Sequence, residues 1–253
     1  MSAALSISRL RTRKGFAGAR LVLLAGAALI LLQISSCGRQ SASLPVMAEH
    51  PIRHSGSEFY VQKFEVTVAE WNACHEAGGC ALKLRTPAEM AAEQTPATGL
   101  SHEDVEEYVD WISRSTGHEF RLPTVAEWKA MAAPILSDAP DPTFTDASLR
   151  WASTYRTENN APRELRPRGS FSQTSEGIAD LDGSVWEWTQ DCYGGPAGGN
   201  VDAADCISYW AAGEHAAALF SKVRDPARGG CAVGTPPAHL GMRLVTDSRV
   251  ASM

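Results

Sequence analysis

The chain has 253 residues, seven of them Trp, and a formal net charge of −6 at pH 7. This length suffices for one domain with a substantial core, and the tryptophans favour a core built on large aromatic side chains. An acidic protein repels the phosphate backbone of nucleic acids, and the chain has neither a P-loop nor a Gly-x-Gly-x-x-Gly motif. Nucleic acid is therefore not expected as a partner.

Residues 1–36 are predicted to be a bacterial lipoprotein signal peptide. Five basic residues and no acidic residue precede the apolar run Leu21–Ile34, which ends in Ile-Ser-Ser directly before Cys37. The run is shorter than the ~20 residues that a membrane-spanning helix needs. We expect cleavage before Cys37 and attachment of lipid to Cys37, which anchors the protein in a membrane. The alternative is an ordinary signal peptide in which this cysteine has no such role.

Processing at Cys37 changes the charge and sets the domain boundaries. The removed segment holds five of the 23 basic residues and none of the 29 acidic residues, so the mature chain carries a formal charge of −11. Residues 37–57 are polar and small and predict a flexible tether, followed by a folded domain at 58–247 and a tail at 248–253. Because Gly38 is not an inner-membrane retention signal, we expect an outer-membrane lipoprotein that faces the periplasm or the cell surface.

Local patterns predict a few regular elements. Alternating apolar residues at 58–68 indicate a first strand, and Thr67 begins a short helix. Ser101 is the N-cap of a helix that continues through Ile112 and ends at Gly117. A capping box at Thr124-Val-Ala-Glu127 begins another helix.

The rest of the chain is poor in regular patterns. Residues 138–176 show no sustained period and predict a long irregular region, which needs disulfides, buried Trp or metal to stabilise it. Residues 240–245 predict a closing strand. With no repeat and no second domain evident, these elements indicate the α+β class.

Export to an oxidising compartment favours disulfide bonds. Cys74 and Cys80 flank a tight Gly-Gly turn, and Cys192 and Cys206 bracket a loop rich in Gly and Pro. Proximity therefore favours these two pairs and leaves Cys231 as the odd cysteine, with a bond between Cys192 and Cys231 as the alternative.

Three blocks of sequence carry a family resemblance. They are Arg121-Leu-Pro-Thr-Val-Ala-Glu-Trp, Gly177-Ile-Ala-Asp-Leu-Asp-Gly-Ser-Val-Trp-Glu-Trp188, and Arg228-Gly-Gly-Cys followed by Gly241-Met-Arg-Leu. In this order and spacing they resemble the formylglycine-generating enzymes, also called sulfatase-modifying factors, over Phe59–Val245. The resemblance implies their variant of the C-type lectin-like fold, a loop-rich single domain.

The resemblance also implies a calcium site at the Trp-Glu-Trp block. In the family an asparagine before the Val-Trp contributes to this site, whereas this chain has Ser184, a weaker ligand for a hard cation. The candidate ligands are Asp180, Asp182, Ser184 and Glu187, and calcium is the one cofactor that the sequence leaves possible. The alternative is that these acids cap turns and cover the surface beside core tryptophans.

Copper is not expected. The family's oxidases hold Cu(I) with two cysteines beyond the Arg-Gly-Gly block, but here a single cysteine, Cys231, occupies that region. His239 follows across Pro-Pro and makes a poor second ligand. Cys231 is a candidate catalytic residue only if the metal site has been redesigned.

The sequence therefore predicts an exported, lipid-anchored accessory or binding protein with a formylglycine-generating-enzyme-like domain that is not catalytic, acting on a protein partner in the envelope. One alternative is an oxidase of protein cysteine with a redesigned metal site at Cys231. A second is a glycan-binding or cell-wall-binding module in which Trp151, Trp210 and Tyr209 stack on sugar rings.

Overall fold

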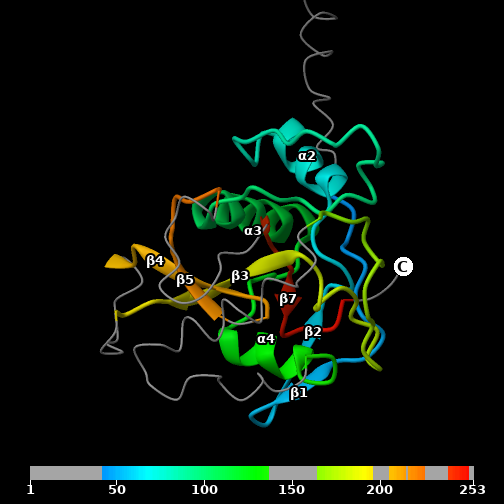
Figure 1. The fold of residues 1–253 in the computed structure, drawn as a ribbon, viewed down its shortest axis with the longest axis vertical. Helices are drawn as coiled ribbons and strands as arrows, with labels where there is room; N and C mark the ends of the chain where they lie inside the picture. Colours follow the sequence, from blue (N-terminus) through cyan, green and yellow to red (C-terminus); the bar gives the residue numbers. More distant parts are fainter. Residues whose placement is uncertain (1–41, 137–163, 196–204, 215, 226–238, 251–253) are drawn as a thin grey trace, which may run out of the picture. The chain divides into compact units, whose positions relative to one another are not determined.

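The computed structural model describes five stretches of the chain: residues 42–136, 164–195, 205–214, 216–225 and 239–250. All belong to the compact unit that begins at Ser41. The predicted signal peptide and the residues Cys37, Trp151 and Cys231 lie outside them. Within these stretches, no helix is both long enough and apolar enough to cross a bilayer. The described residues form a loop-rich α+β domain (Figure 1).

Three helices each begin with a capping box, in which the N-cap hydroxyl accepts from the N3 amide and the N3 carboxylate accepts from the N-cap amide. The helices are α2 (Val68–Glu76), α3 (His102–Thr116) and α4 (Val125–Ala132). Their boxes pair Thr67 with Glu70, Ser101 with Asp104, and Thr124 with Glu127. The helix α3 ends at Gly117, whose φ of 72° is left-handed, as the sequence predicted.

Two sheets hold the strands. The first has the order β1-β2-β7 and is antiparallel, and the second has the order β5-β4-β3-β6 with β6 parallel to β3. Their bounds are β1 (Ile52–His54), β2 (Ser57–Val61), β3 (Val185–Cys192), β4 (Ser208–Ala212), β5 (Ala216–Phe220), β6 (His239–Gly241) and β7 (Val245–Thr246).

The tether predicted at 37–57 is wrong for its described part. Strand β1 pairs with β2, and the amide of Ala48 donates to the carbonyl of Val61 at 2.8 Å. Ser55 and Gly56 join the two strands with φ of 50° and 83°, both left-handed, which is the geometry of a tight hairpin turn. These small polar residues belong to a hairpin rather than to a linker.

Both predicted strands are shorter in the structure. The strand expected at 58–68 ends at Val61, and the strand expected at 240–245 divides into β6 and β7, which belong to different sheets. The division falls at Arg243, whose side chain turns into the interior and is fully buried.

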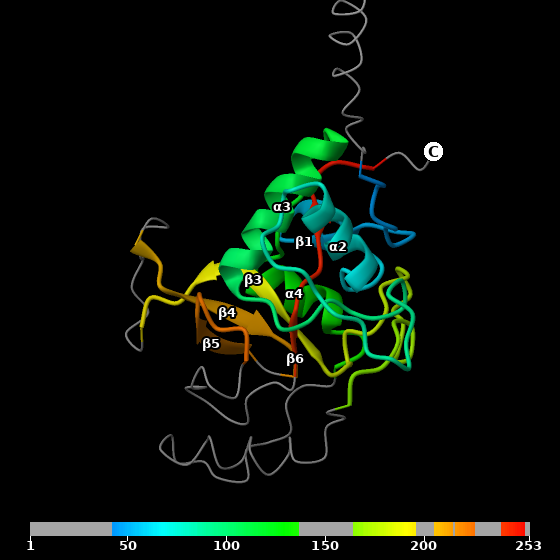
Figure 2. The same ribbon diagram turned by 90° about the horizontal axis from the view of Figure 1, so that it is seen from above.

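Two hydrophobic clusters cover the two faces of the larger sheet. Trp186 and Trp188 project from β3 into one cluster, as strand alternation predicted, together with Trp71 from α2 and residues of α3. On the other face, Trp128 of α4 packs with Ala212 of β4. Figures 1 and 2 show α3 and α4 on opposite sides of β3.

Candidate functional site

A buried arginine holds the centre of the domain. The Nε and Nη2 of Arg243 donate to Oε1 of Glu187 at 3.0 and 2.8 Å. Its Nη1 donates to the carbonyls of Gln62 and Lys63, and its Nη2 also donates to the carbonyl of Ala179. All five N–H groups of the guanidinium are therefore used, which is what full burial of this group requires.

Glu187, a candidate calcium ligand, is committed to this arrangement. It is 1% exposed, and its Oε2 accepts from Nε1 of Trp128 at 2.8 Å. The idea that the acids beside the tryptophans cover the surface is therefore wrong for Glu187. The side chain of Arg243 supplies the positive charge that this carboxylate needs.

Glu65 is the third member of the cluster, and the sequence did not single it out. It follows β2, is 2% exposed, and its Oε2 has no hydrogen-bond partner in the described part of the protein. The nearest cation, Nη2 of Arg243, lies 3.9 Å from Oε2. Burial raises the pKa of Glu65 to about 8; Arg243 opposes this rise, and Glu187 and Asp180 add to it.

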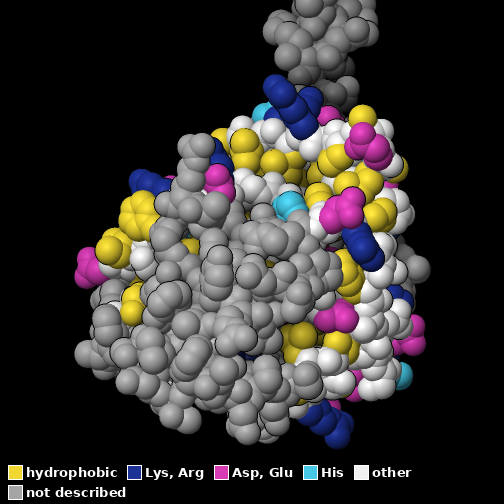
Figure 3. All heavy atoms as spheres, in the orientation of Figure 1, with side chains coloured by type: hydrophobic (Ala, Val, Ile, Leu, Met, Phe, Trp, Pro, Cys, Tyr) yellow, Lys and Arg dark blue, Asp and Glu magenta, His cyan; other side chains and the backbone are white. Residues whose placement is uncertain are grey.

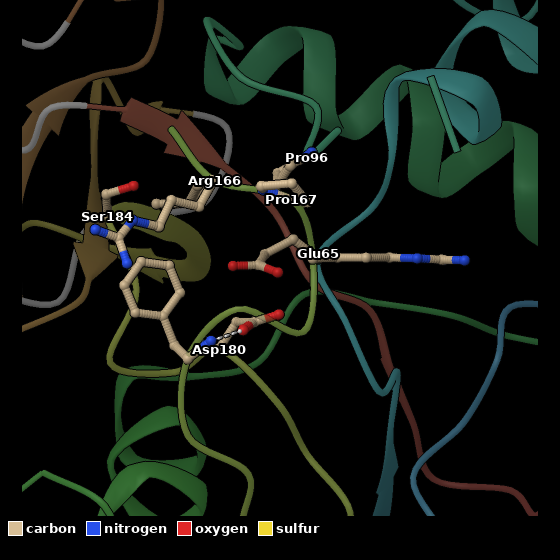
Figure 4. Close-up of a pocket in the computed structure, with 9 residues that line it drawn as sticks. Glu65, Pro96, Arg166, Pro167, Asp180 and Ser184 are labelled. Carbon is tan, nitrogen blue, oxygen red and sulfur yellow. Dashed lines mark hydrogen bonds between the residues drawn. The ribbon is translucent and has the colours of Figure 1, made fainter. Parts of the chain in front are cut away.

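The carboxyl group of Glu65 faces a small, partly open pocket with a cavity volume of about 10 Å³, which is room for one group the size of a water molecule. Figure 4 shows it pointing into a space bounded by Arg166 and Ser184 on the opposite side and by Asp180. The lining residues are Glu65, Pro96, Arg166, Pro167, Arg168, Phe171, Asp180, Ser184 and Val185.

Asp180 holds one wall of the pocket in place. Its backbone is left-handed, with φ of 65°, a conformation that Asp tolerates better than most residues. Its Oδ1 accepts from the amide of Phe171 at 2.9 Å, and its Oδ2 accepts from the amide of Gly169. Both oxygens of this candidate calcium ligand are thus engaged by the backbone.

The other candidate calcium ligands are also engaged. Asp182 accepts from the amide and hydroxyl of Ser172, and Ser184 donates to the carbonyl of Glu164 at 3.0 Å. Among the described residues, no three His, Cys, Asp or Glu side chains gather as a metal site would require. Calcium takes six to eight oxygen ligands. The four candidates do not converge on one point, so they do not fit a calcium ion as a set.

Both predicted disulfide pairs are bonded. Cys74–Cys80 has a Cα–Cα distance of 5.4 Å and Cys192–Cys206 one of 5.9 Å. The first pair is buried and joins Cys74 of α2 to the turn after that helix, and the second is partly exposed at the end of β3. Cys231, the odd cysteine, lies outside the described residues.

Tyr209 and Trp210, the two described side chains considered for glycan binding, do not form one platform, and Trp151 lies outside the described residues. Tyr209 stacks on His102 of α3 with ring centroids 3.5 Å apart, whereas Trp210 packs edge-on against Tyr193. Neighbouring residues of a strand point to opposite faces, so these two rings are separated by the sheet. Apolar side chains do gather where β4 begins (Figure 3), and the exposed ones there include Ile207 and Phe220.

The family model for the Sulfatase-modifying factor enzyme 1-like domain matches residues 18–248. The chain belongs to this family. The resemblance carried by the three sequence blocks is thereby confirmed. No curated protein matches the chain significantly.

Solved structures place this sulfatase-modifying-factor domain among similar folds. PvdO from Pseudomonas aeruginosa matches with a TM-score of 0.52 and 20% identity, covering 83% of this chain and 87% of that one. Variable protein 1 of Treponema denticola matches with a TM-score of 0.48 and 13% identity over 81% and 94%. CarF matches with 0.46 and 16% over 75% and 86%. At these identities the likeness concerns the fold alone.

Arg121, Glu127 and Trp128 of the family's first block have structural roles. The guanidinium of Arg121 donates to both oxygens of Glu127 at 2.7 Å, and Glu127 closes the capping box of α4. The signal for the missed residues was weak but present. Glu65 and Arg243 each interrupt a short apolar run, and a charge in such a run indicates a buried ion pair.

Proposed function

We propose that this protein is an exported, lipid-anchored accessory or binding protein of the cell envelope, whose sulfatase-modifying-factor domain binds rather than oxidises. The observation that carries the proposal is the pocket at Glu65. There a buried carboxyl oxygen with no hydrogen-bond partner among the described residues faces an opening. The carboxylates of Glu187 and Asp180 around it are used for internal contacts.

The sequence of the C-terminal segment supports the same proposal. Cu(I) chemistry of the family's kind needs two thiolates close together. The segment from Arg228 to Arg243 contains a single cysteine, Cys231. The same segment is rich in Gly and Pro where the family carries arginines and aromatics. We therefore propose that formylglycine synthesis by the copper route does not occur.

The decisive experiment measures oxidation directly. The purified protein, incubated with copper, oxygen and a Cys-x-Pro-x-Arg peptide, should give no aldehyde product by mass spectrometry. An aldehyde product that disappears in Cys231→Ser would refute the binding role and make Cys231 the reactive centre. An aldehyde that persists in Cys231→Ser would place catalysis elsewhere, and would refute it as well.

Attachment to the membrane is tested separately. Export, lipidation at Cys37 and residence in the outer membrane rest on the lipobox and on the absence of a retention signal at Gly38. Wild-type protein should fractionate with outer membranes and need detergent for release, whereas Cys37→Ala should not be processed. Wild-type protein found free in the periplasm would exclude the lipid anchor. Crosslinking in intact cells should then capture the envelope partner.

A further inference from the structure

We propose that the pocket at Glu65 binds the zwitterionic head of an α-amino acid, with the ammonium group on Glu65 and the carboxylate on Arg166. The proposal rests on the binding role described above and names its ligand class. It starts from the oxygen of Glu65, which is buried, faces the pocket and has no hydrogen-bond partner among the described residues.

A buried carboxyl oxygen without a donor is unfavourable. Burial of a polar group costs free energy unless a hydrogen bond replaces the lost contact with water, and the cost is higher for a charged group. Arg243 is too distant to supply that bond, since its nearest nitrogen lies 3.9 Å away and its N–H groups are donated elsewhere. With the pocket empty, burial keeps this carboxyl protonated up to about pH 8, its pKa. A positively charged donor that enters through the pocket would supply the missing partner and stabilise the carboxylate instead.

A primary ammonium group meets this need better than a divalent cation does. Calcium needs six to eight oxygens, and both oxygens of Asp180 already accept backbone amides. The hydroxyl of Ser184 is likewise donated to the carbonyl of Glu164. An ammonium group needs only a few acceptors and can use the one oxygen that remains, while Pro96 and Pro167 provide apolar walls for its carbon atom.

The opposite side of the pocket carries positive charge. Arg166 and Arg168 line it, and their guanidinium groups lie over the rings of Phe171 and Phe64 at 5.6 and 5.0 Å. Within the described residues, no carboxylate pairs with Arg166. The positive charge of a simple amine would be repelled by the guanidinium of Arg166 across the pocket. The negative charge of a simple carboxylate would be repelled by the carboxylate of Glu65.

A zwitterion matches both sides at once. Its ammonium group supplies the donor that Glu65 lacks, and its carboxylate accepts charge-assisted hydrogen bonds from the guanidinium of Arg166. Figure 4 shows the two side chains on opposite sides of the same space. The source of the head group is a free amino acid, whose amine and carboxylate are both unblocked.

Three probes of matched size test this assignment on the purified mature protein: glycine, methylammonium and acetate. Calorimetry or ligand-observed NMR should show that glycine binds more tightly than either single-charge probe. Arg166→Gln should weaken glycine binding about tenfold or more, because a charge-assisted hydrogen bond is lost. Glu65→Gln should weaken it similarly. Arg53→Gln is the matched control, since Arg53 is 83% exposed and pairs with Glu58 in the β1–β2 hairpin.

Several outcomes would overturn the inference. Equal binding of glycine and methylammonium would mean that Arg166 is not used, and unchanged glycine affinity in Arg166→Gln would mean the same. Calcium that binds and displaces glycine would assign the pocket to the metal. Because Arg166 is exposed, its variant keeps the test valid even if Glu65→Gln fails to fold. Absence of glycine binding refutes this ligand only, whereas aldehyde formation refutes the proposed function.

Discussion

Two arginine–carboxylate clusters in this protein use the same chemistry in different surroundings. Arg243 contacts Glu187 in the interior, and both side chains are at most 1% exposed. Arg121 contacts Glu127 and Asp247 at the edge of α4, where the Arg121 side chain is 27% exposed and that of Asp247 is 69% exposed. Both arginines donate in pairs, so geometry alone does not distinguish them.

Burial makes the difference. Exposed ion pairs contribute little because water solvates each partner when the pair is broken. A buried pair is costly to form and more costly to leave incomplete. Every carboxylate at the edge has its donors, whereas the interior cluster contains Glu65 with an unused oxygen. The incomplete cluster is therefore the better place to look for function.

The largest expected effect comes from removing the interior arginine. Arg243→Met leaves Glu187 and Glu65 buried without their cation, and should lower the free energy of unfolding by roughly 3–5 kcal/mol. Arg121→Met should cost less, about 1.5–3 kcal/mol, because its hydrogen-bonded pair with Glu127 is partly buried, at 27% and 15% exposed. Denaturant unfolding of the two variants gives the comparison directly. Equal losses would show that burial does not separate the clusters.

The interior cluster should also give stability a pH dependence. The folded pKa of Glu65 is about 8 against 4.5 for the free side chain, so the folded state holds this proton more tightly. Stability should therefore fall as pH rises from about 4.5 to about 8, by no more than about 1.4 kcal/mol per pH unit. Glu65→Gln should flatten the slope.

His102 requires a restricted range for that measurement. Burial lowers the pKa of His102 from 6.5 to about 4, so its contribution to stability is lost as pH falls through that range. This pH dependence has the opposite sign to that of Glu65. Thermal or denaturant unfolding between pH 6.5 and 8 isolates Glu65. A wild-type slope in that window equal to the slope of Glu65→Gln would contradict the assignment.

A smaller change removes one donor from the interior cluster. Trp128→Phe keeps most of the ring but deletes the Nε1 hydrogen bond to Glu187, and should cost about 1.5–3 kcal/mol because the acceptor is charged and buried. Trp71→Phe is the matched control, since Nε1 of Trp71 donates to a neutral backbone carbonyl. A smaller loss of stability for Trp128→Phe than for Trp71→Phe would show that the negative charge of Glu187 does not strengthen this hydrogen bond.

The smallest effect is expected at the edge. Burial tends to raise the pKa of Glu127, but hydrogen bonds from Arg121 and Thr124 outweigh it and lower that pKa. Asp247 is exposed to solvent where it pairs with Arg121. Asp247→Asn should therefore lower the free energy of unfolding by only about 0.2–1 kcal/mol, and by less at high salt. Chemical denaturation at low and high ionic strength measures both. If Asp247→Asn lowered the free energy of unfolding as much as Arg243→Met, ion pairs at the edge of α4 would contribute as much stability as those in the interior.

The sequence by itself determined the features that depend on neighbours along the chain. The N-caps Thr67, Ser101 and Thr124 need only the residue three positions on, and each begins a helix as predicted. The disulfides close short loops, and alternation in β3 places Trp186 and Trp188 on one face. The family signature belongs here too, because it consists of ordered local blocks.

Only the tertiary structure decided the interior charges and the pocket. Nothing local distinguishes Ser55-Gly56 in a linker from the same residues in a hairpin, because the partner strand makes the difference. Glu187 was a plausible metal ligand until Arg243, distant in sequence, was seen to neutralise it. Glu65 faces the pocket because the segment after β2, the loop at Asp180 and the stretch from Arg166 to Phe171 meet there. Electrostatic and packing energies depend on distance in space, and distance in space between remote segments is set by the fold.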